Sequence, residues 1–407
     1  MSRDRAVGAA RVLVAGSAAL VALVACSGSS GTASAPTHSP ASRPPATSGA
    51  TASPGTPPAG RWQVLPGMPP VLDPSNIYAA DAPGNISPVA RHDRPLIYVP
   101  NSESNTVSVI NPRTYKVIAT HRVGALPQHV TPSWDLRTLY VLNDEGNSVT
   151  PINPANGRFG KPIPVADPYN MYFTPNGRYA IVVAERLNRL DFVNPHTMKL
   201  RHALPVHCQG VDHADFSANG RYAIFSCEFS SKLVKIDIQA QKVVGHLSLP
   251  KRRGAAMPMP QDVKLSPDGK TFYVADMASN GVWMINGRTL KVIGFRATGK
   301  GAHGLYASRN SKYLYVSNRD EGSVSLINLA TTKIVRKWRI GGSPDMGGVS
   351  ANGKVLWLSG RYDSVVYAIN TRTGHRIATI PVGGGPHGLC VYPQPGRYSL
   401  GHTGVFR

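Results

Sequence analysis

The chain has 407 residues, enough for two or three ordinary domains or for one large repeat domain. Charged residues make up only 16% of it, while 40 glycines and 35 prolines are present, a mix typical of an all-β, turn-rich protein. The 44 basic and 22 acidic residues leave a formal net charge of +22, which favours anionic surroundings and carries no information about fold.

The N-terminus has the layout of an export signal. Three arginines are followed by an apolar run over residues 12–25, which is too short for a comfortable membrane span. The run ends in Leu-Val-Ala-Cys at residues 23–26, which resembles the bacterial lipobox, in which the cysteine is lipidated and becomes the new N-terminus. We therefore expect residues 1–25 to be a lipoprotein signal peptide and Cys26 to anchor the protein at the extracytoplasmic face of the cell membrane; an ordinary cleaved signal is the alternative.

Two segments separate the anchor from the rest. Residues 26–60 consist of the cysteine and a Ser/Thr/Pro/Ala-rich stretch without large apolar residues, which cannot bury enough surface to offset chain entropy and is expected to be a disordered linker. Residues 61–95 combine large apolar residues with seven prolines. We expect them to form an irregular arm packed on the main domain.

From residue 96 onward the chain repeats itself. The marker is an apolar, β-branched residue followed by Asn or Asp, with spacings of 42, 41, 43, 49, 42 and 42 residues. Such a period predicts a propeller, a solenoid or an array. The marker pairs are Ile110-Asn111, Ile152-Asn153, Val193-Asn194, Ile236-Asp237, Ile285-Asn286, Ile327-Asn328 and Ile369-Asn370.

Each repeat contains four short strands, as residues 260–294 illustrate. Strand-like runs at 260–265, 271–276, 281–285 and 290–294 are separated by turn signals such as Ser266-Pro267-Asp268-Gly269. Glycine, proline and β-branched clusters interrupt any helical reading of the region. Four antiparallel strands per unit, repeated radially, predict a β-propeller.

The second strand of several units carries a family resemblance. Four units contain Tyr98-Val99-Pro100-Asn101, Tyr140-Val141-Leu142-Asn143, Tyr273-Val274-Ala275-Asp276 and Tyr315-Val316-Ser317-Asn318. They resemble the YVTN signature of surface-layer-type β-propellers, a superfamily that includes the cytochrome d1-like propeller and the N-terminal propeller of nitrous oxide reductase. Units 3, 4 and 7 depart from the signature. The resemblance covers residues 96–393 and implies the propeller fold.

The first strands of the units show how the ring closes. Seven such strands begin at Pro127, Pro168, Val211, Pro260, Ala302, Pro344 and Pro386. The first unit lacks its own first strand, so the segment Pro386–Tyr392 is expected to pair with Leu96–Asn101 and close a seven-bladed ring. The propeller then spans residues 96–393, and residues 394–407 are a C-terminal tail.

The first strands also line the central channel and bring polar side chains to one mouth. Their first two channel positions contain four histidines, three aspartates and a methionine, more than the composition leads one to expect. These candidate ligand or metal residues are His129, His213, His303, His387, Met346, Asp212, Asp262 and Asp345. Because they occupy two adjacent positions of a strand, we expect the two sets to point in opposite directions.

Two readings of this ring stay open. Imidazole with thioether suits copper, and imidazole with carboxylate suits zinc or iron, so copper and zinc are the candidate cofactors. The copper in the histidine-lined propeller of nitrous oxide reductase favours this reading by resemblance, although no Cys-x-x-Cys-His haem motif is present. In the other reading the side chains solvate trapped water. Carboxylates in nearby loops would favour a cation or an amine at the same mouth.

Two cysteines flank one hairpin. Cys208 precedes the first strand of unit 4 and Cys227 ends its second strand, which brings them to the same end of an antiparallel pair. Since an exported protein is oxidised, we expect a disulfide, with a pair of thiolate metal ligands as the alternative.

The expected function follows from this combination. We expect a lipid-anchored, non-catalytic propeller that binds a ligand or protein partner at its channel face. The alternatives are a copper or zinc propeller with redox or hydrolytic chemistry, and docking on anionic envelope polymers through basic residues of the outer strands. We expect a monomer, and the lack of a basic stripe interleaved with aromatics argues against nucleic acid.

Overall fold

The computed structural model describes residues 63–407. The predicted signal peptide, Cys26 and the linker lie outside the described residues. Within the described part of the chain, no helix is long and apolar enough to cross a membrane.

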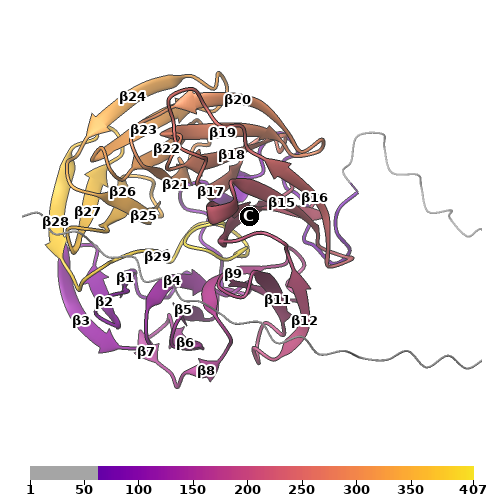
Figure 1. Ribbon diagram of the computed structural model, residues 1–407. Coiled ribbons are helices and arrows are strands. Elements are labelled where there is room, and N and C mark those ends of the chain that lie inside the picture. The colour runs from indigo at the N-terminus through magenta and orange to yellow at the C-terminus, as the bar shows by residue number, and fades with distance from the viewer. Residues whose placement is uncertain (1–62) are drawn as a thin grey trace, which may run out of the picture. The chain divides into compact units, whose positions relative to one another are not determined.

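Seven antiparallel sheets are arranged radially around a central channel (Figure 1). This confirms the all-β, seven-bladed propeller predicted from the repeat. From the channel outward, each blade consists of strands A, B, C and D. Two short 3-10 helices lie outside the blades, at Ala79–Asp81 (η1) and Glu228–Ser230 (η2).

The strand bounds follow the predicted units closely. Strands A of blades 1 to 7 are β29 (Cys390–Tyr392), β4 (Pro127–Pro132), β9 (Pro168–Phe173), β13 (Val211–Phe216), β17 (Pro260–Leu265), β21 (Ala302–Ala307) and β25 (Pro344–Val349). Strands B are β1 (Leu96–Asn101), β5 (Leu139–Asn143), β10 (Ala180–Ala184), β14 (Tyr222–Cys227), β18 (Thr271–Asp276), β22 (Tyr313–Asn318) and β26 (Val355–Gly360). Strands C are β2 (Thr106–Asn111), β6 (Ser148–Asn153), β11 (Arg189–Val193), β15 (Lys232–Asp237), β19 (Gly281–Asn286), β23 (Ser323–Asn328) and β27 (Val365–Asn370). Strands D are β3 (Lys116–Arg122), β7 (Arg158–Phe159) with β8 (Ile163–Pro164), β12 (Leu200–Pro205), β16 (Lys242–Ser248), β20 (Lys291–Ala297), β24 (Ile334–Arg339) and β28 (Arg376–Pro381).

The C-terminal strand closes the ring, as predicted. Strand β29 pairs antiparallel with β1, with Leu96 opposite Tyr392 and Tyr98 opposite Cys390. The regular strand is shorter than the expected Pro386–Tyr392, because the backbone of Gly388 bonds instead to blade 2. Its amide donates to the carbonyl of Gln128 (2.9 Å). The closing segment is therefore shared between two blades.

The repeated Asn or Asp of the sequence marker holds the turn between strands C and D. In every blade its side-chain oxygen accepts a hydrogen bond from a backbone N–H two or three residues later. The preceding apolar residue, such as Ile110 or Ile285, is fully buried between blades. An Asx turn beside a buried residue explains why this pair recurs once per blade.

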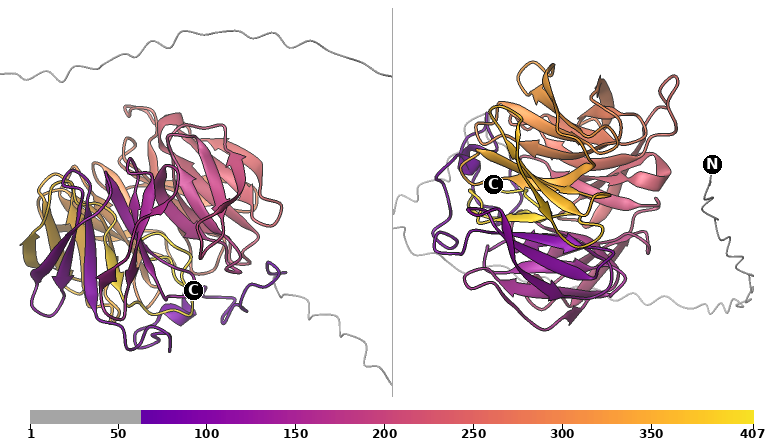
Figure 2. Two further views of the ribbon diagram at one scale, coloured as in Figure 1. Left: turned by 90° about the horizontal axis from the view of Figure 1, so that it is seen from below. Right: turned by 90° about the vertical axis from the view of Figure 1, so that its left-hand side faces the viewer.

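One end of the channel is covered by residues 63–95 and by the C-terminal tail (Figure 2). The arm over residues 63–95 crosses the turns between strands A and B: the amide of Leu65 donates to the carbonyl of Asn219, and that of Ile77 to the carbonyl of Pro267. The tail enters beneath it, and the Leu400 carbonyl accepts a bond from the amide of Phe173. The arm and the tail therefore lie at one end of the channel, and the loops between strands B and C lie at its other mouth.

Candidate functional site

Two adjacent positions of each innermost strand supply the channel side chains. Contrary to the expected alternation, the rings of His129 and His387, one from each position, have centroids only 4.9 Å apart. In blades 2 to 7 the pairing of strand A with strand B shifts register near these positions. Such irregularities turn the backbone and break strict alternation, so the expectation of opposite directions is wrong here.

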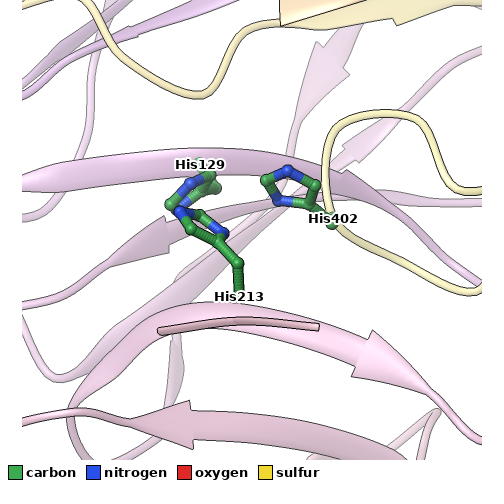
Figure 3. Close-up of side chains that lie close together, drawn as sticks. All are labelled: His129, His213 and His402. Atoms are coloured by element: carbon green, nitrogen blue, oxygen red, sulfur yellow. The ribbon is translucent and has the colours of Figure 1, made fainter. Parts of the chain in front are cut away.

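Three imidazoles form a tight cluster (Figure 3). His129 comes from β4, His213 from β13 and His402 from the tail, and one ring nitrogen of each lies within 4.8 Å of the other two. All three residues are buried, with 0 to 1% of their surface exposed. Burial lowers the pKa of His213 to about 4 and holds those of His129 and His402 well below their ordinary value. The rings are therefore neutral at pH 7 and carry lone pairs.

Hydrogen bonds fix the tautomers of this cluster. Nδ1 of His129 lies 2.9 Å from the carbonyl of Tyr169, so Nδ1 carries the proton and Nε2 presents a lone pair. The side-chain amide of Asn170 donates to Nδ1 of His213 (2.9 Å) and to Nδ1 of His402 (3.0 Å). The side-chain oxygen of Asn170 accepts a hydrogen bond from the backbone amide of Met171, which identifies the side-chain nitrogen as the atom that faces the two imidazoles. The backbone and one asparagine thus orient all three rings.

A second group of ionisable residues lies nearer the mouth, on blades 6, 7 and 1. The carboxylate of Asp345 accepts hydrogen bonds from His387 Nδ1 (2.7 Å) and from Arg319 (2.6 and 2.9 Å), and His303 Nδ1 lies 3.1 Å away. Burial alone would raise the pKa of Asp345, but Arg319 and the two imidazoles hold it well below its ordinary value. Asp345 is therefore ionised and anchors this wall of the channel.

The opposite wall, on blades 3 and 4, contains carboxyl groups instead. Asp212 is fully buried on β13, and Glu185 and Glu228 lie in the loops between strands B and C. Burial, Asp212 and Glu228 raise the pKa of Glu185 to about 8, and burial and Asp212 raise that of Glu228 to about 7. At pH 7 Glu185 is therefore mostly protonated and Glu228 partly so, whereas Asp345 on the other wall is ionised and paired with Arg319.

The structure brings most of the predicted channel residues together. His303 joins the cluster through contacts with His387 and His213, with ring centroids 5.9 and 6.3 Å apart. Oδ2 of Asp262 accepts a hydrogen bond from the backbone amide of Leu305, and Oδ1 of Asp262 lies 3.8 Å from Nε2 of His402. Met346 is fully buried on β25, where its amide donates to the hydroxyl of Ser359.

Sequence reasoning missed His402. This residue follows the last repeat, so the alignment of strands that nominated the other histidines did not include it. A signal was present, because the tail contains Leu400, Val405 and Phe406, all of which are almost fully buried. Apolar residues at this spacing indicate a packed segment rather than a free end.

The two cysteines of blade 4 are bonded to each other. Cys208 and Cys227 form a disulfide with an S–S distance of 2.08 Å, and Cys227 ends strand β14 as the pairing argument requires. With their sulfurs joined, these cysteines do not act as thiolate ligands. The third described cysteine, Cys390, is a buried free thiol within β29.

Comparison with known proteins gives a family for this architecture. A family model described as YNCE-like β-propeller matches residues 62–395, which is most of the chain. No curated protein sequence matches this chain.

Solved structures share the fold at low sequence identity. Hydrazine synthase of Kuenenia stuttgartiensis has a TM-score of 0.59 at 20% identity, over 72% of this chain and 96% of that one. Dihydro-heme d1 dehydrogenase NirN, in complex with DHE, has a TM-score of 0.56 at 15% identity, over 76% and 77%. A functionally unknown protein from Desulfotomaculum acetoxidans has a TM-score of 0.58 at 14% identity, over 71% and 98%. At these identities the likeness shows the propeller fold alone.

Proposed function

Because the chain belongs to the YNCE-like β-propeller family, we propose that it is a binding protein built on that propeller and that its channel takes a transition-metal ion of the zinc or copper class. The observation that carries the proposal is the cluster of three buried imidazoles, His129, His213 and His402, with ring nitrogens within 4.8 Å of one another. Imidazole suits both metals, and three protein ligands with one open position is a common arrangement.

The surroundings of the cluster support this proposal. His129 donates its Nδ1 proton to a backbone carbonyl, the second-sphere arrangement that metal-ligating histidines adopt. A carboxyl oxygen of Asp262 lies 3.8 Å from Nε2 of His402, close enough to offset part of the charge of a bound cation. If Nδ1 of His213 or His402 is the metal ligand, the hydrogen bond from the side-chain amide of Asn170 to that nitrogen must break when the metal binds.

The test measures metal content. The full-length chain, exported so that its disulfide forms, is exposed separately to Zn²⁺ and Cu²⁺, desalted and analysed for metal per protein. We expect about one equivalent in the wild type. A His129→Ala/His213→Ala variant should lose it, and variants of the exposed His375 should retain it. Equal metal in all three proteins, or none in the wild type, would contradict the proposal.

We further propose that the protein is a lipoprotein held at the extracytoplasmic face of the membrane. The support is the sequence at residues 23–26, where Cys26 follows the apolar run. Metabolic labelling with a radioactive fatty acid should mark the wild type, and a Cys26→Ser variant should be released from the membrane unlabelled. Labelling that survives Cys26→Ser would contradict this assignment.

A second candidate function, docking on anionic envelope polymers, rests on the outer edge of the propeller. Strands D expose basic side chains, including Lys242, Lys291, Lys337, Arg339 and Arg376. Charges on edge strands also prevent edge-to-edge pairing, so charge alone does not establish docking. Binding to a teichoic acid preparation should weaken steeply with added salt; binding independent of salt would rule this function out.

A further inference from the structure

Beyond the proposed metal site, a groove of about 550 Å³ opens between blades 6 and 7, which are neighbours in the ring (Figure 1). It lies on the face of the turns between strands A and B, and Pro83 of the arm is among its lining residues. Tyr315 and Leu326, which are almost fully buried, form its floor. The volume is within the range of about 300–1,000 Å³ that is typical of small-molecule sites.

Three arginines line this groove, and no acidic side chain does. They are Arg309 in the turn between β21 and β22, Arg336 on β24, and Arg372 in the turn between β27 and β28. Within residues 63–407 no carboxylate lies within salt-bridge distance of any of the three. The charge of Asp81 acts on Arg309 from a greater distance, but Asp81 does not line the groove. Three guanidinium groups without a paired carboxylate favour an anionic ligand.

Two of these arginines reach across the boundary between the blades. Nε and Nη2 of Arg309, on blade 6, donate to the blade 7 carbonyls of Ser350 (3.2 Å) and Val349 (2.7 Å). Nη1 of Arg336, also on blade 6, donates to the blade 7 carbonyl of Arg372 (3.2 Å). A guanidinium group has five N–H donors, so these bonds leave most of them unused. Both groups are therefore positioned at the groove before any ligand binds.

Two asparagines add hydrogen-bond donors to the groove. Asn310 and Asn352 occupy the same position of the turns between strands A and B in blades 6 and 7, and the side-chain oxygen of each accepts a serine hydroxyl and a backbone amide of its own turn. That assigns the oxygen and leaves the side-chain nitrogen as a donor. In blade 3 the equivalent Asn176 donates from this nitrogen to the carbonyl of Pro66 in the arm (2.9 Å). Acceptor oxygens of a ligand would take the place of that carbonyl between blades 6 and 7.

Comparison with the other blades shows that this groove is both open and charged. Between blades 3 and 4 the corresponding groove is lined by Leu65 and Pro66 of the arm, and about 170 Å³ remains. Leu65 is 2% exposed, so the arm fills that groove with an apolar side chain. Arg309 is also the only charged residue at its position of the turn in blades 2 to 7. The other five residues there are Trp134, Pro175, Ala218, Pro267 and Ala351.

We propose that the groove between blades 6 and 7 binds a small organic phosphate, with its phosphate group at Arg309, Arg336 and Arg372. A phosphate monoester carries between one and two negative charges at neutral pH and has three acceptor oxygens, and the planar guanidinium group pairs with it in a bidentate manner. A carboxylate has one charge and two oxygens, so it would satisfy fewer of these donors. The volume leaves room for an organic group beside the phosphate. The site is separate from the histidine cluster and does not depend on a bound metal.

Calorimetric titration of the full-length protein with glucose 6-phosphate tests the proposal, with glucose as the uncharged probe. We expect binding of glucose 6-phosphate that weakens with added salt, and no binding of glucose. An Arg336→Gln/Arg372→Gln variant should bind at least about tenfold more weakly, because hydrogen bonds between charged groups are lost. The matched control is Arg339→Gln/Arg376→Gln, which removes the same charge from exposed residues of the same two blades outside the groove. It should bind as the wild type does.

A second variant separates binding from folding. Asn310→Asp keeps the turn, because blade 5 has Asp268 at this position and its carboxylate accepts the same two hydrogen bonds. The change replaces a donor by a negatively charged acceptor, so glucose 6-phosphate binding should fall at least about tenfold while the urea midpoint stays that of the wild type.

Three results would each overturn the proposal. The first is no binding of glucose 6-phosphate to the wild type, including the case in which the protein binds only vesicles that contain phosphatidic acid, since the arginines would then serve a lipid surface. The second is glucose binding as tightly as glucose 6-phosphate. The third is equal affinity in the Arg336→Gln/Arg372→Gln variant and its matched control.

Discussion

The side-chain amide of Asn170 donates a hydrogen bond to Nδ1 of His402, 3.0 Å away, across 232 residues of sequence. The same nitrogen donates to Nδ1 of His213. One asparagine on β9 therefore joins the C-terminal tail to a strand of the next blade. The tail is part of the channel floor, and the three-histidine cluster does not exist without it.

Gly388→Ala should damage the metal site without unfolding the propeller. A β-carbon at Gly388 would overlap the ring of His129, so the imidazole must move. We expect metal affinity to fall about 10- to 100-fold, the range seen when ligand positioning is lost. The matched control is Gly404→Ala in the tail, where a β-carbon meets no atom within 4 Å. Equal metal affinity in both variants, measured by competition with a chelator, would show that His129 is not a ligand.

Arg407→Met should destabilise the protein strongly. The guanidinium of Arg407 lies 2.8 Å from Oδ1 of Asp215, and both residues are buried. Removing one partner leaves an uncompensated buried charge, which typically costs about 3–5 kcal/mol in free energy of unfolding. Two backbone amides still donate hydrogen bonds to the Asp215 carboxylate in the variant and partly stabilise its charge. We therefore expect a loss near the lower limit of this range.

Urea denaturation measures this change, and substitution of the exposed Arg372 by methionine is the control. The Asp215→Asn/Arg407→Met double variant should recover part of the loss, because the buried charge is gone. A loss below about 1 kcal/mol in the single variant would mean that the tail is not an integral part of the fold.

Most of the fold could be predicted from the sequence because the turn chemistry repeats. The Asn or Asp of each marker, such as Asn111 or Asn286, makes the same Asx turn in its blade. The spacing of these turn residues in the sequence therefore predicts the number and length of the blades. Ring closure followed from counting strands. The order of the units alone was enough to predict that the last strand, β29, lies next to β1.

The site was only partly predictable, and the reasons are physical. The four channel histidines could be found because they occupy equivalent strand positions, whereas His402 is outside the repeat. Their relative directions could not be found, because the register shift in strand A depends on pairing with its neighbour. The role of Asn170 as a donor to two imidazoles requires knowledge of where the tail lies.

The disulfide should contribute substantially to stability. Cys208 and Cys227 enclose a loop with a sequence separation of 19 residues. In the chain-entropy model a loop of this size contributes about 3 kcal/mol to the free energy of unfolding. The Cys208→Ser/Cys227→Ser variant should lose this amount in urea denaturation. Dithiothreitol should lower the midpoint of the wild type similarly and leave the variant unaffected; a wild type insensitive to reduction would contradict the prediction.

The carboxyl groups at the mouth should make the protein less stable as the pH rises. In the folded state the pKa of Glu185 is raised to about 8 and that of Glu228 to about 7, from an ordinary value of 4.5. Between pH 4.5 and 8 the folded state therefore binds more protons than the unfolded state, so the free energy of unfolding falls with increasing pH.

Denaturation at pH 5 and pH 9 checks this slope. The Glu185→Gln/Glu228→Gln variant should show a smaller loss of stability between these two conditions than the wild type, because amides do not ionise. The Glu103→Gln variant, which changes an exposed carboxylate in blade 1, should follow the wild type. If the double variant keeps the full pH dependence, the carboxyl groups of Glu185 and Glu228 are not desolvated as described.

The most direct test of the metal proposal is an anomalous difference map from crystals of the full-length protein exposed to Zn²⁺. We predict a single strong peak enclosed by His129, His213 and His402, about 2.0–2.1 Å from a ring nitrogen of each. An empty cluster, with anomalous peaks only at exposed histidines such as His375, would contradict the account.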